Sequence, residues 1–273
     1  MATAAISAGL QRGPGRPRWQ RWALKPVPGL ISFVGFVVIW QLVILIFDPK
    51  PILLPGPADV WREFIDTWAA GDLWPPVIDS MRAMFLGLII SLIVGIPLGL
   101  AIGMSPTADL ITSPYLWGFF AMPRIALAPI LILILGFGYE VKVWLVILSA
   151  IVPIILSCKD GVQTTDESLV RAAQSFGAGR IDMFAKVIAP NTLPFIASGV
   201  RNGISRGFVG LLVIELTVGS GGIGSEVMQS MRNFNTARMF AFTGVLIAIA
   251  LVLVSLSRKV EGYASRWREE VVL

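Results

Sequence analysis

Long apolar runs dominate the chain and indicate helices that cross a membrane. The first run, residues 30–47, is interrupted only by Ser32 and Gln41, and its 18 residues form about 27 Å of helix. That length is close to the thickness of a bilayer core. Five further runs follow, at residues 83–103, 113–138, 143–157, 193–218 and 239–256. The pattern therefore predicts an all-α integral membrane protein with six spans.

Composition supports this fold class and removes several kinds of chemistry. The chain has 273 residues, of which 55% are hydrophobic and 14% charged, whereas soluble domains carry about 25% charge. It has no histidine, which is the commonest general base and metal ligand. The single cysteine, Cys158, excludes an intrachain disulfide and a thiolate metal cluster. We therefore expect no metal site.

Basic residues lie mainly on one side of the predicted membrane. The N-terminal tail carries five, the 158–192 segment four and the C-terminal tail four, against six on the opposite side. The positive-inside rule places both termini and the 158–192 segment in the cytoplasm. This asymmetry explains the net charge of +5 without nucleic acid as a partner. We expect residues 1–29 to form a disordered tail, residues 30–257 the membrane domain and residues 258–273 a second cytoplasmic tail.

Two polar segments between the spans have amphipathic patterns. Residues 58–67 predict a short helix that lies either on the outer membrane interface or on the rim of the bundle. Thr164 and Glu167 have the spacing of a capping box that opens another helix, and Gly177 suits its left-handed end. Its apolar face consists of Leu169, Ala172, Ala173 and Phe176. A second short helix is expected to stop at Pro190. The pair is either interfacial or a docking element for a soluble partner.

Small residues recur every fourth position in two of the spans, a spacing that allows close helix packing. The second span has Gly87, Ser91, Gly95, Gly99 and Gly103, and the fifth has Gly199, Gly203 and Gly207. The sequence leaves open whether the partner helix belongs to the same chain or to a second copy.

Charged residues within the spans need an explanation, because ionised groups at this depth usually face a bundle interior or water. Arg124 lies in the third span, and Arg201, Arg206 and Glu215 lie in the fifth. Arg201 is close enough to the inner boundary to snorkel. Arg206 and Glu215 are too far apart to pair along one helix, so each is expected to have another partner or to line a cavity. Together with the kinks expected at Pro123, Pro129 and Pro153, they indicate a transport pathway.

Catalytic motifs are otherwise missing. Residues 219–224 match G-x-G-x-x-G, but they follow a span and no acidic residue occurs about 20 positions later, so we interpret them as a sharply turning outer loop. The chain has no phosphate-binding P-loop. It is therefore not expected to bind ATP itself or to act as an enzyme.

The segment from Arg171 to Pro190 resembles the EAA loop of binding-protein-dependent ABC importer permeases. Arg171, Ala172, Ala173 and Gly177 are followed by Val187 and Pro190, in the spacing of Glu-Ala-Ala, Gly and Ile-x-Leu-Pro. Arg171 replaces the glutamate, for which Glu167 one turn earlier can substitute. Residues 53–57, 122–129 and 199–201 and Glu215 are similar to the nitrate, sulfonate and taurine branch.

This resemblance implies a type I importer permease of the bacterial inner membrane that transports a small anion by alternating access. It implies as partners two cytoplasmic ATPase subunits carrying ATP and Mg²⁺, an extracytoplasmic binding protein and a second permease copy. Residues 164–190 would be the coupling segment, in which Glu167, Phe176 and the motif residues contact the ATPase. Two alternatives stay open: a proton-coupled secondary transporter that uses Glu215, and a membrane scaffold that transports nothing.

Overall fold

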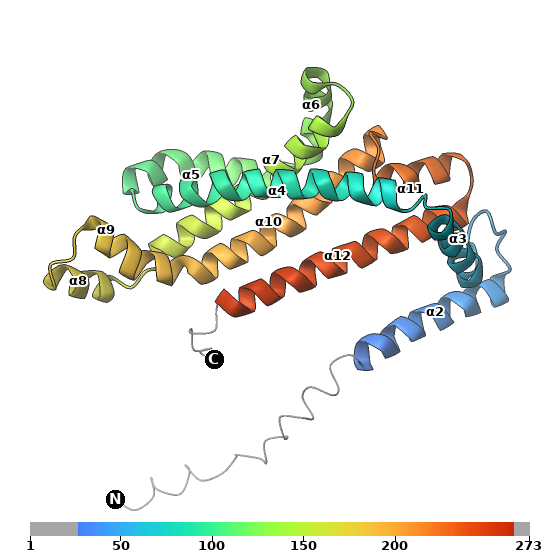
Figure 1. Ribbon diagram of the computed structural model, residues 1–273, viewed down its shortest axis with the longest axis horizontal. Coiled ribbons are helices and arrows are strands. Elements are labelled where there is room, and N and C mark those ends of the chain that lie inside the picture. Colours follow the sequence, from blue (N-terminus) through green and yellow to red (C-terminus); the bar gives the residue numbers. More distant parts are fainter. Residues whose placement is uncertain (1–26, 265–273) are drawn as a thin grey trace, which may run out of the picture. The chain divides into compact units, whose positions relative to one another are not determined.

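The computed structural model describes residues 27–264, and its regular structure is helical throughout that range (Figure 1). Four helical stretches are long and apolar enough to cross a membrane, and a fifth results if one bent helix pair is counted as a single span. The four contain α4 (Trp74–Gly103), α7 (Tyr139–Gln163), α10 (Ala189–Val218) and α12 (Thr236–Ala264). The predicted all-α membrane fold is confirmed.

The chain divides into two compact units, residues 1–59 and 60–273. In the first unit, α2 (Val27–Phe47) ends at the predicted residue, and its large apolar side chains are mostly exposed, as expected of a helix surrounded by lipid. It is a shorter apolar helix than the four above, so the count of six spans stays a prediction. The predicted tails fall largely outside the described residues.

In the second unit, α7 is packed between α4 and α10, and both small-residue stripes face it. A β-carbon added to Gly99 of α4 would lie 2.6 Å from the carbonyl oxygen of Ile155, and one added to Gly203 of α10 would lie 2.9 Å from the Ile154 side chain. The glycines of the two stripes that contact α7 are Gly87, Gly95, Gly99 and Gly103 on α4 and Gly199, Gly203 and Gly207 on α10. The close packing left open by the sequence is therefore made within one chain.

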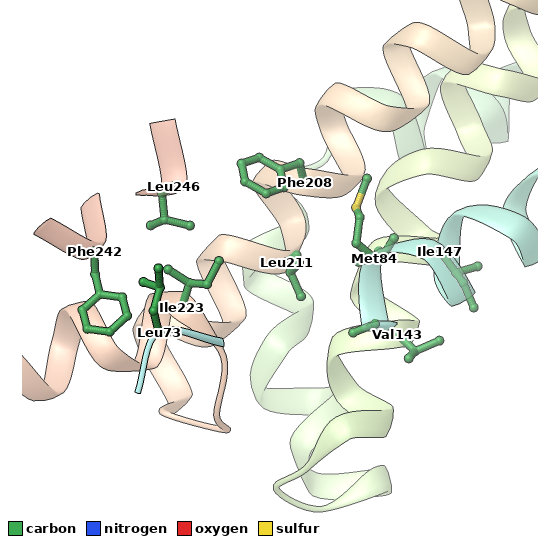
Figure 2. Close-up of a cluster of buried hydrophobic side chains, with 11 residues drawn as sticks. Leu73, Met84, Val143, Ile147, Phe208, Leu211, Ile223, Phe242 and Leu246 are labelled. Carbon is green, nitrogen blue, oxygen red and sulfur yellow. The ribbon is translucent and has the colours of Figure 1, made fainter. Parts of the chain in front are cut away.

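A buried apolar cluster joins these three helices to α11 (Ile223–Arg232) and α12. Figure 2 labels the larger side chains of this cluster, which are Leu73, Met84, Val143, Ile147, Phe208, Leu211, Ile223, Phe242 and Leu246. Leu211 and Ile223 are completely buried, and 1% of Phe242 is exposed. This cluster fixes the end of the bundle at which α10 turns into α11.

Several predicted span boundaries are too narrow, because polar residues near the helix ends have partners inside the protein. Helix α7 extends to Gln163 rather than 157, and the Lys159 ammonium group donates hydrogen bonds to Asp109 (3.0 Å) and Ser113 (2.9 Å). Helix α4 begins at Trp74 instead of residue 83, with Pro75 and Pro76 in a first turn that needs no backbone donors. Helix α12 continues past residue 257 to Ala264.

The third predicted span is broken. Helix α5 (Pro106–Ala121) ends before Pro123, the 3₁₀ turn η1 (Arg124–Leu127) follows, and α6 (Ala128–Leu135) leaves at 90° to α5. Pro123 therefore accounts for a break, as expected. Pro129 does not kink a helix, because it occupies the first turn of α6, where proline is favourable.

The predicted amphipathic segment at 58–67 forms α3 (Pro57–Ala69). Phe64 packs against the apolar cluster of the second unit, which favours the rim of the bundle over a helix that lies only on the interface. Trp61, Ile65 and Trp68 nevertheless remain substantially exposed.

The segment between α7 and α10 contains α8 (Glu167–Ser175), α9 (Arg180–Met183) and the π-turn η2 (Phe184–Ile188). The expected stop at Pro190 is wrong. Pro190 lies in the first turn of α10, where its missing N–H breaks no hydrogen bond, so the helical path continues into the span.

Candidate functional site

Helix α8 begins at a side-chain cap that differs from the predicted one. The Asp166 carboxylate accepts a hydrogen bond from the Ser168 amide at 2.7 Å, and this bond lowers the pKa of the carboxyl group. Thr164 instead closes α7, where its hydroxyl donates to the Asp160 carbonyl at 2.9 Å. Asp166 competes successfully for the cap because it lies immediately before the helix, with its backbone in the extended conformation.

The end of α8 is confirmed at Gly177, whose φ of +77° lies in the left-handed region. The Ala178 amide donates to the Ala173 carbonyl at 3.0 Å, and the Gly177 amide donates to Gln174 at 2.9 Å. This pair of bonds is the Schellman motif, which ends a helix and reverses the chain. The turn lies between α8 and α9 and sets the angle between these two short helices, which lie at one end of α7 and α10 (Figure 1).

The apolar face of α8 and the turn that follows is left uncovered. Phe176 is 92% exposed, Ile181 84% and Leu169 53%. Glu167 and Arg171 form an exposed ion pair at 3.2 Å, which is worth little in water but places opposite charges beside this face. Val187 and Pro190 are half-buried below it, where the segment joins α10. Such an apolar surface is typical of a contact with another protein.

At the opposite end of α7 and α10, Glu215 is fully buried in a polar cluster. Its carboxylate accepts hydrogen bonds from the Ser80 hydroxyl at 2.7 Å and the Gly224 amide at 3.0 Å. The Lys142 ammonium group, also fully buried, lies 3.5 Å from Glu215 and 2.5 Å from Asp79. The cluster thus joins α4, α7, α10 and α11.

The glycine loop that follows α10 wraps around this carboxylate. Gly219, Gly221 and Gly222 have φ values of +67°, +85° and +89°, which confirms the sharp turn. A β-carbon on Gly222 would lie 2.0 Å from a Glu215 carboxylate oxygen. The loop therefore needs glycine for close approach as well as for its backbone conformation.

Arg206 has a different environment from Glu215. Its guanidinium carbon lies 4.2 Å from the centre of the Phe120 ring, and its side chain lines a cavity of about 220 Å³ between α5, α7 and α10. Arg201 does not snorkel freely, because it pairs with Glu261 of α12 at 3.2 Å. The backbone of Arg124 begins η1, and its side chain lies outside the described part of the structure.

Sequence reasoning missed Lys142, Asp79 and Ser80. Lys142 falls between the predicted spans 113–138 and 143–157, but the structure buries it in the first turn of α7. The available signal was the intramembrane Glu215, because a buried carboxylate requires a cation and hydrogen-bond donors from neighbouring helices. Which helices supply them depends on how the spans pack.

These features define a multi-span membrane protein with a closely packed core, a charged cavity and an exposed apolar turn. Residues 95–261 match the binding-protein-dependent transport system inner membrane component family, and the chain belongs to that family. It is the permease subunit of an ABC importer and a multi-pass inner-membrane protein. The family implies an ATPase and a substrate-binding protein as partners.

Two curated relatives cover nearly the whole chain. The chain is 31% identical over 255 residues to the putative aliphatic sulfonates transport permease protein SsuC of Escherichia coli K12, with 93% of each chain covered. It is 28% identical over 263 residues to the taurine transport system permease protein TauC of the same organism, which covers 94% of this chain and 95% of the relative.

A solved structure shows the same fold. It is the MetNI methionine ABC transporter in inward-facing conformations, with a TM-score of 0.60 and 19% identity, covering 69% of this chain and 94% of that chain. The predicted type I importer permease fold is confirmed.

Proposed function

We propose that this permease carries a small anion of the sulfonate class into the cell and that the turn from α8 to α9 is the surface on which the ATPase docks. The exposed apolar face at Leu169, Phe176 and Ile181 carries the docking proposal. An apolar surface of this kind is stabilised when a partner covers it. The substrate class is supported by the two relatives named for aliphatic sulfonates and taurine.

The path from this turn into the membrane is short and stiff. α8 and α9 lie between α7 and α10 in the chain, and these two helices meet through glycine contacts such as Gly199 with Ser157. A displacement of the docked turn therefore moves both helices together. If the ATP-bound ATPase binds one conformation of the permease more tightly than the other, the conformational equilibrium of the permease shifts toward that conformation. Switching between the two conformations in this way is alternating access.

The chain acts here without catalysis of its own. ATP and Mg²⁺ are bound by the ATPase subunits, and a second copy of this permease completes the pathway. We infer that both termini and the α8–α9 segment face the cytoplasm. Thirteen basic residues on that side against six on the other support this orientation.

Co-purification of the ATPase tests the docking surface. Ala173 belongs to the apolar face of α8, whereas Gln174, about 100° further around the helix, lies outside that face. Ala173→Asp places a charge on the apolar face and is expected to release the ATPase and abolish uptake. Gln174→Asp adds the same charge to the polar face, and this control should retain both. Equal ATPase retention by the two variants, or a wild-type chain that binds no ATPase, would refute the proposal.

A further inference from the structure

The cavity beside Arg206 carries both signs of charge at membrane depth. Trp117 and Phe120 of α5, Ser157 and Asp160 of α7, and Asn202 and Arg206 of α10 line it, together with apolar residues of α7. Its volume of about 220 Å³ is smaller than the roughly 300–1,000 Å³ of pockets for drug-sized ligands. It therefore suits a solute of only a few heavy atoms.

Within the described part of the chain, Arg206 differs from the neighbouring Arg201 in having no acidic partner. Arg201 is neutralised by Glu261 at 3.2 Å. Among the described residues, no carboxylate lies within 4.0 Å of the Arg206 nitrogens, and its guanidinium rests on the Phe120 ring. An unpaired guanidinium at this depth is costly, and an anion that enters the cavity would offset that cost.

The helix register directs the two charged side chains toward each other. Gly199 contacts Ser157 across the α7–α10 interface. Arg206 lies seven residues beyond Gly199 on α10, and Asp160 lies three residues beyond Ser157 on α7, in the opposite direction along the bundle. The α-carbons of Arg206 and Asp160 are therefore separated by about 15 Å along the helix axis. Side chains lean toward the N-terminus of their own helix. Because α7 and α10 are antiparallel, the guanidinium and the carboxylate both point into the intervening space.

We propose that this cavity is a transit site for a small zwitterion. Arg206 receives the anionic oxygens of the solute, and Asp160 receives its ammonium group. Asn202 and Ser157 lie one turn from Arg206 and Asp160 respectively and provide hydrogen bonds, while Trp117 covers the carbon chain. The inference rests on the proposed import of a sulfonate-class anion and narrows it to aminosulfonates over plain alkanesulfonates.

Charged thiol reagents can map this polarity without knowledge of the substrate. The purified importer complex in detergent would carry either Asn202→Cys, beside Arg206, or Ser157→Cys, beside Asp160. The wild-type chain gives the blank, because its own Cys158 is buried. Labelling rates are compared for 2-sulfonatoethyl and 2-(trimethylammonium)ethyl methanethiosulfonate. The first reagent ends in the group that Arg206 is proposed to bind.

The labelling rate of the anionic reagent divided by that of the cationic reagent should be roughly tenfold higher at position 202 than at position 157. The reason is that Arg206 and Asp160 each act at short range in a partly dehydrated cavity. Arg206→Gln should remove the anionic preference at position 202, and Asp160→Asn should remove the cationic preference at position 157. The control Arg201→Gln should change neither ratio. Equal ratios at the two positions, or ratios unaffected by Arg206→Gln and Asp160→Asn, would overturn the proposal.

This outcome is separate from that of the proposed function. ATPase co-purification with the unlabelled complex reports on docking, whereas the reagent ratios report on the cavity alone. A polar cavity in a chain that binds no ATPase would therefore be recognised as such. If neither position 202 nor position 157 shows a charge preference while the ATPase still co-purifies, only the zwitterion site is refuted.

Discussion

Lys142→Met removes the cation that neutralises Glu215. The methionine side chain fills much of the same space, so the main effect is electrostatic. Glu215 is fully buried and would keep only the hydrogen bonds from Ser80 and Gly224. Removing one partner of a buried ion pair typically costs about 3–5 kcal/mol. Asp79 adds little, because 38% of its side chain is exposed and water can replace the lost contact.

Glu215→Gln is expected to be milder. Lys142 would still hold Asp79 at 2.5 Å, and the amide oxygen can still accept from Ser80. The loss is then that of one buried charge-assisted hydrogen bond, about 1–3 kcal/mol. The double variant Lys142→Met/Glu215→Gln leaves no buried charge without a partner. It should therefore cost less than the sum of the single variants by at least about 1 kcal/mol.

Thermal unfolding of the purified protein in detergent measures these differences, with the folded fraction read by size-exclusion chromatography. Lys142→Met should lower the midpoint by roughly 10 °C, and Glu215→Gln by a few degrees. A Lys142→Met protein as stable as wild type, or a double variant that loses the full sum, would show that the cluster is not held by its charges.

Three further results are expected. Gly99→Leu should impair folding or assembly, because the added side chain meets the Ile155 carbonyl. The control Gly118→Leu should be tolerated, because the space around Gly118 is open. Similar yields of folded protein for the two variants would contradict this prediction. Asp166→Ala should speed amide exchange in α8 at pH 7, and Asp166→Asn, which keeps the accepting oxygen but loses the charge, should speed it less. The pKa of Asp166 is lowered by folding, so its stabilising charge is present above about pH 4 and is lost as the pH falls. A reporter at the C-terminus should be cytoplasmic and one near Gly71 external, and the reverse would refute the assigned orientation.

The hydrophobic pattern predicts the helices well but not their polar ends. The ends of α2, α4 and α10 at Phe47, Gly103 and Val218 agree with the sequence, because apolar runs stop abruptly there. The start of α7 does not, since Lys142 looks like the edge of a loop until Asp79 and Glu215 are placed beside it. A charge ends a hydrophobic run in the sequence whether or not the fold supplies its partner.

The candidate site is likewise predictable from the sequence only in part. The left-handed turn at Gly177 is predictable, because it depends on residues adjacent in the chain. The cap shows the limit of local rules: the capping-box spacing selects Thr164, but Asp166, two residues later, accepts the hydrogen bond from the Ser168 amide. The cavity beside Arg206 depends on the register between α7 and α10 and on the break at Pro123, and no spacing within one segment predicts either.

Reconstitution into proteoliposomes tests the central claim most directly. Complexes of the wild-type permease and its ATPase are supplied with the binding protein and with radiolabelled taurine outside and ATP inside. The account predicts uptake that requires ATP and the binding protein, and that Ala173→Asp abolishes. Uptake driven by an imposed proton gradient without ATP would contradict it and favour a secondary transporter that uses Glu215.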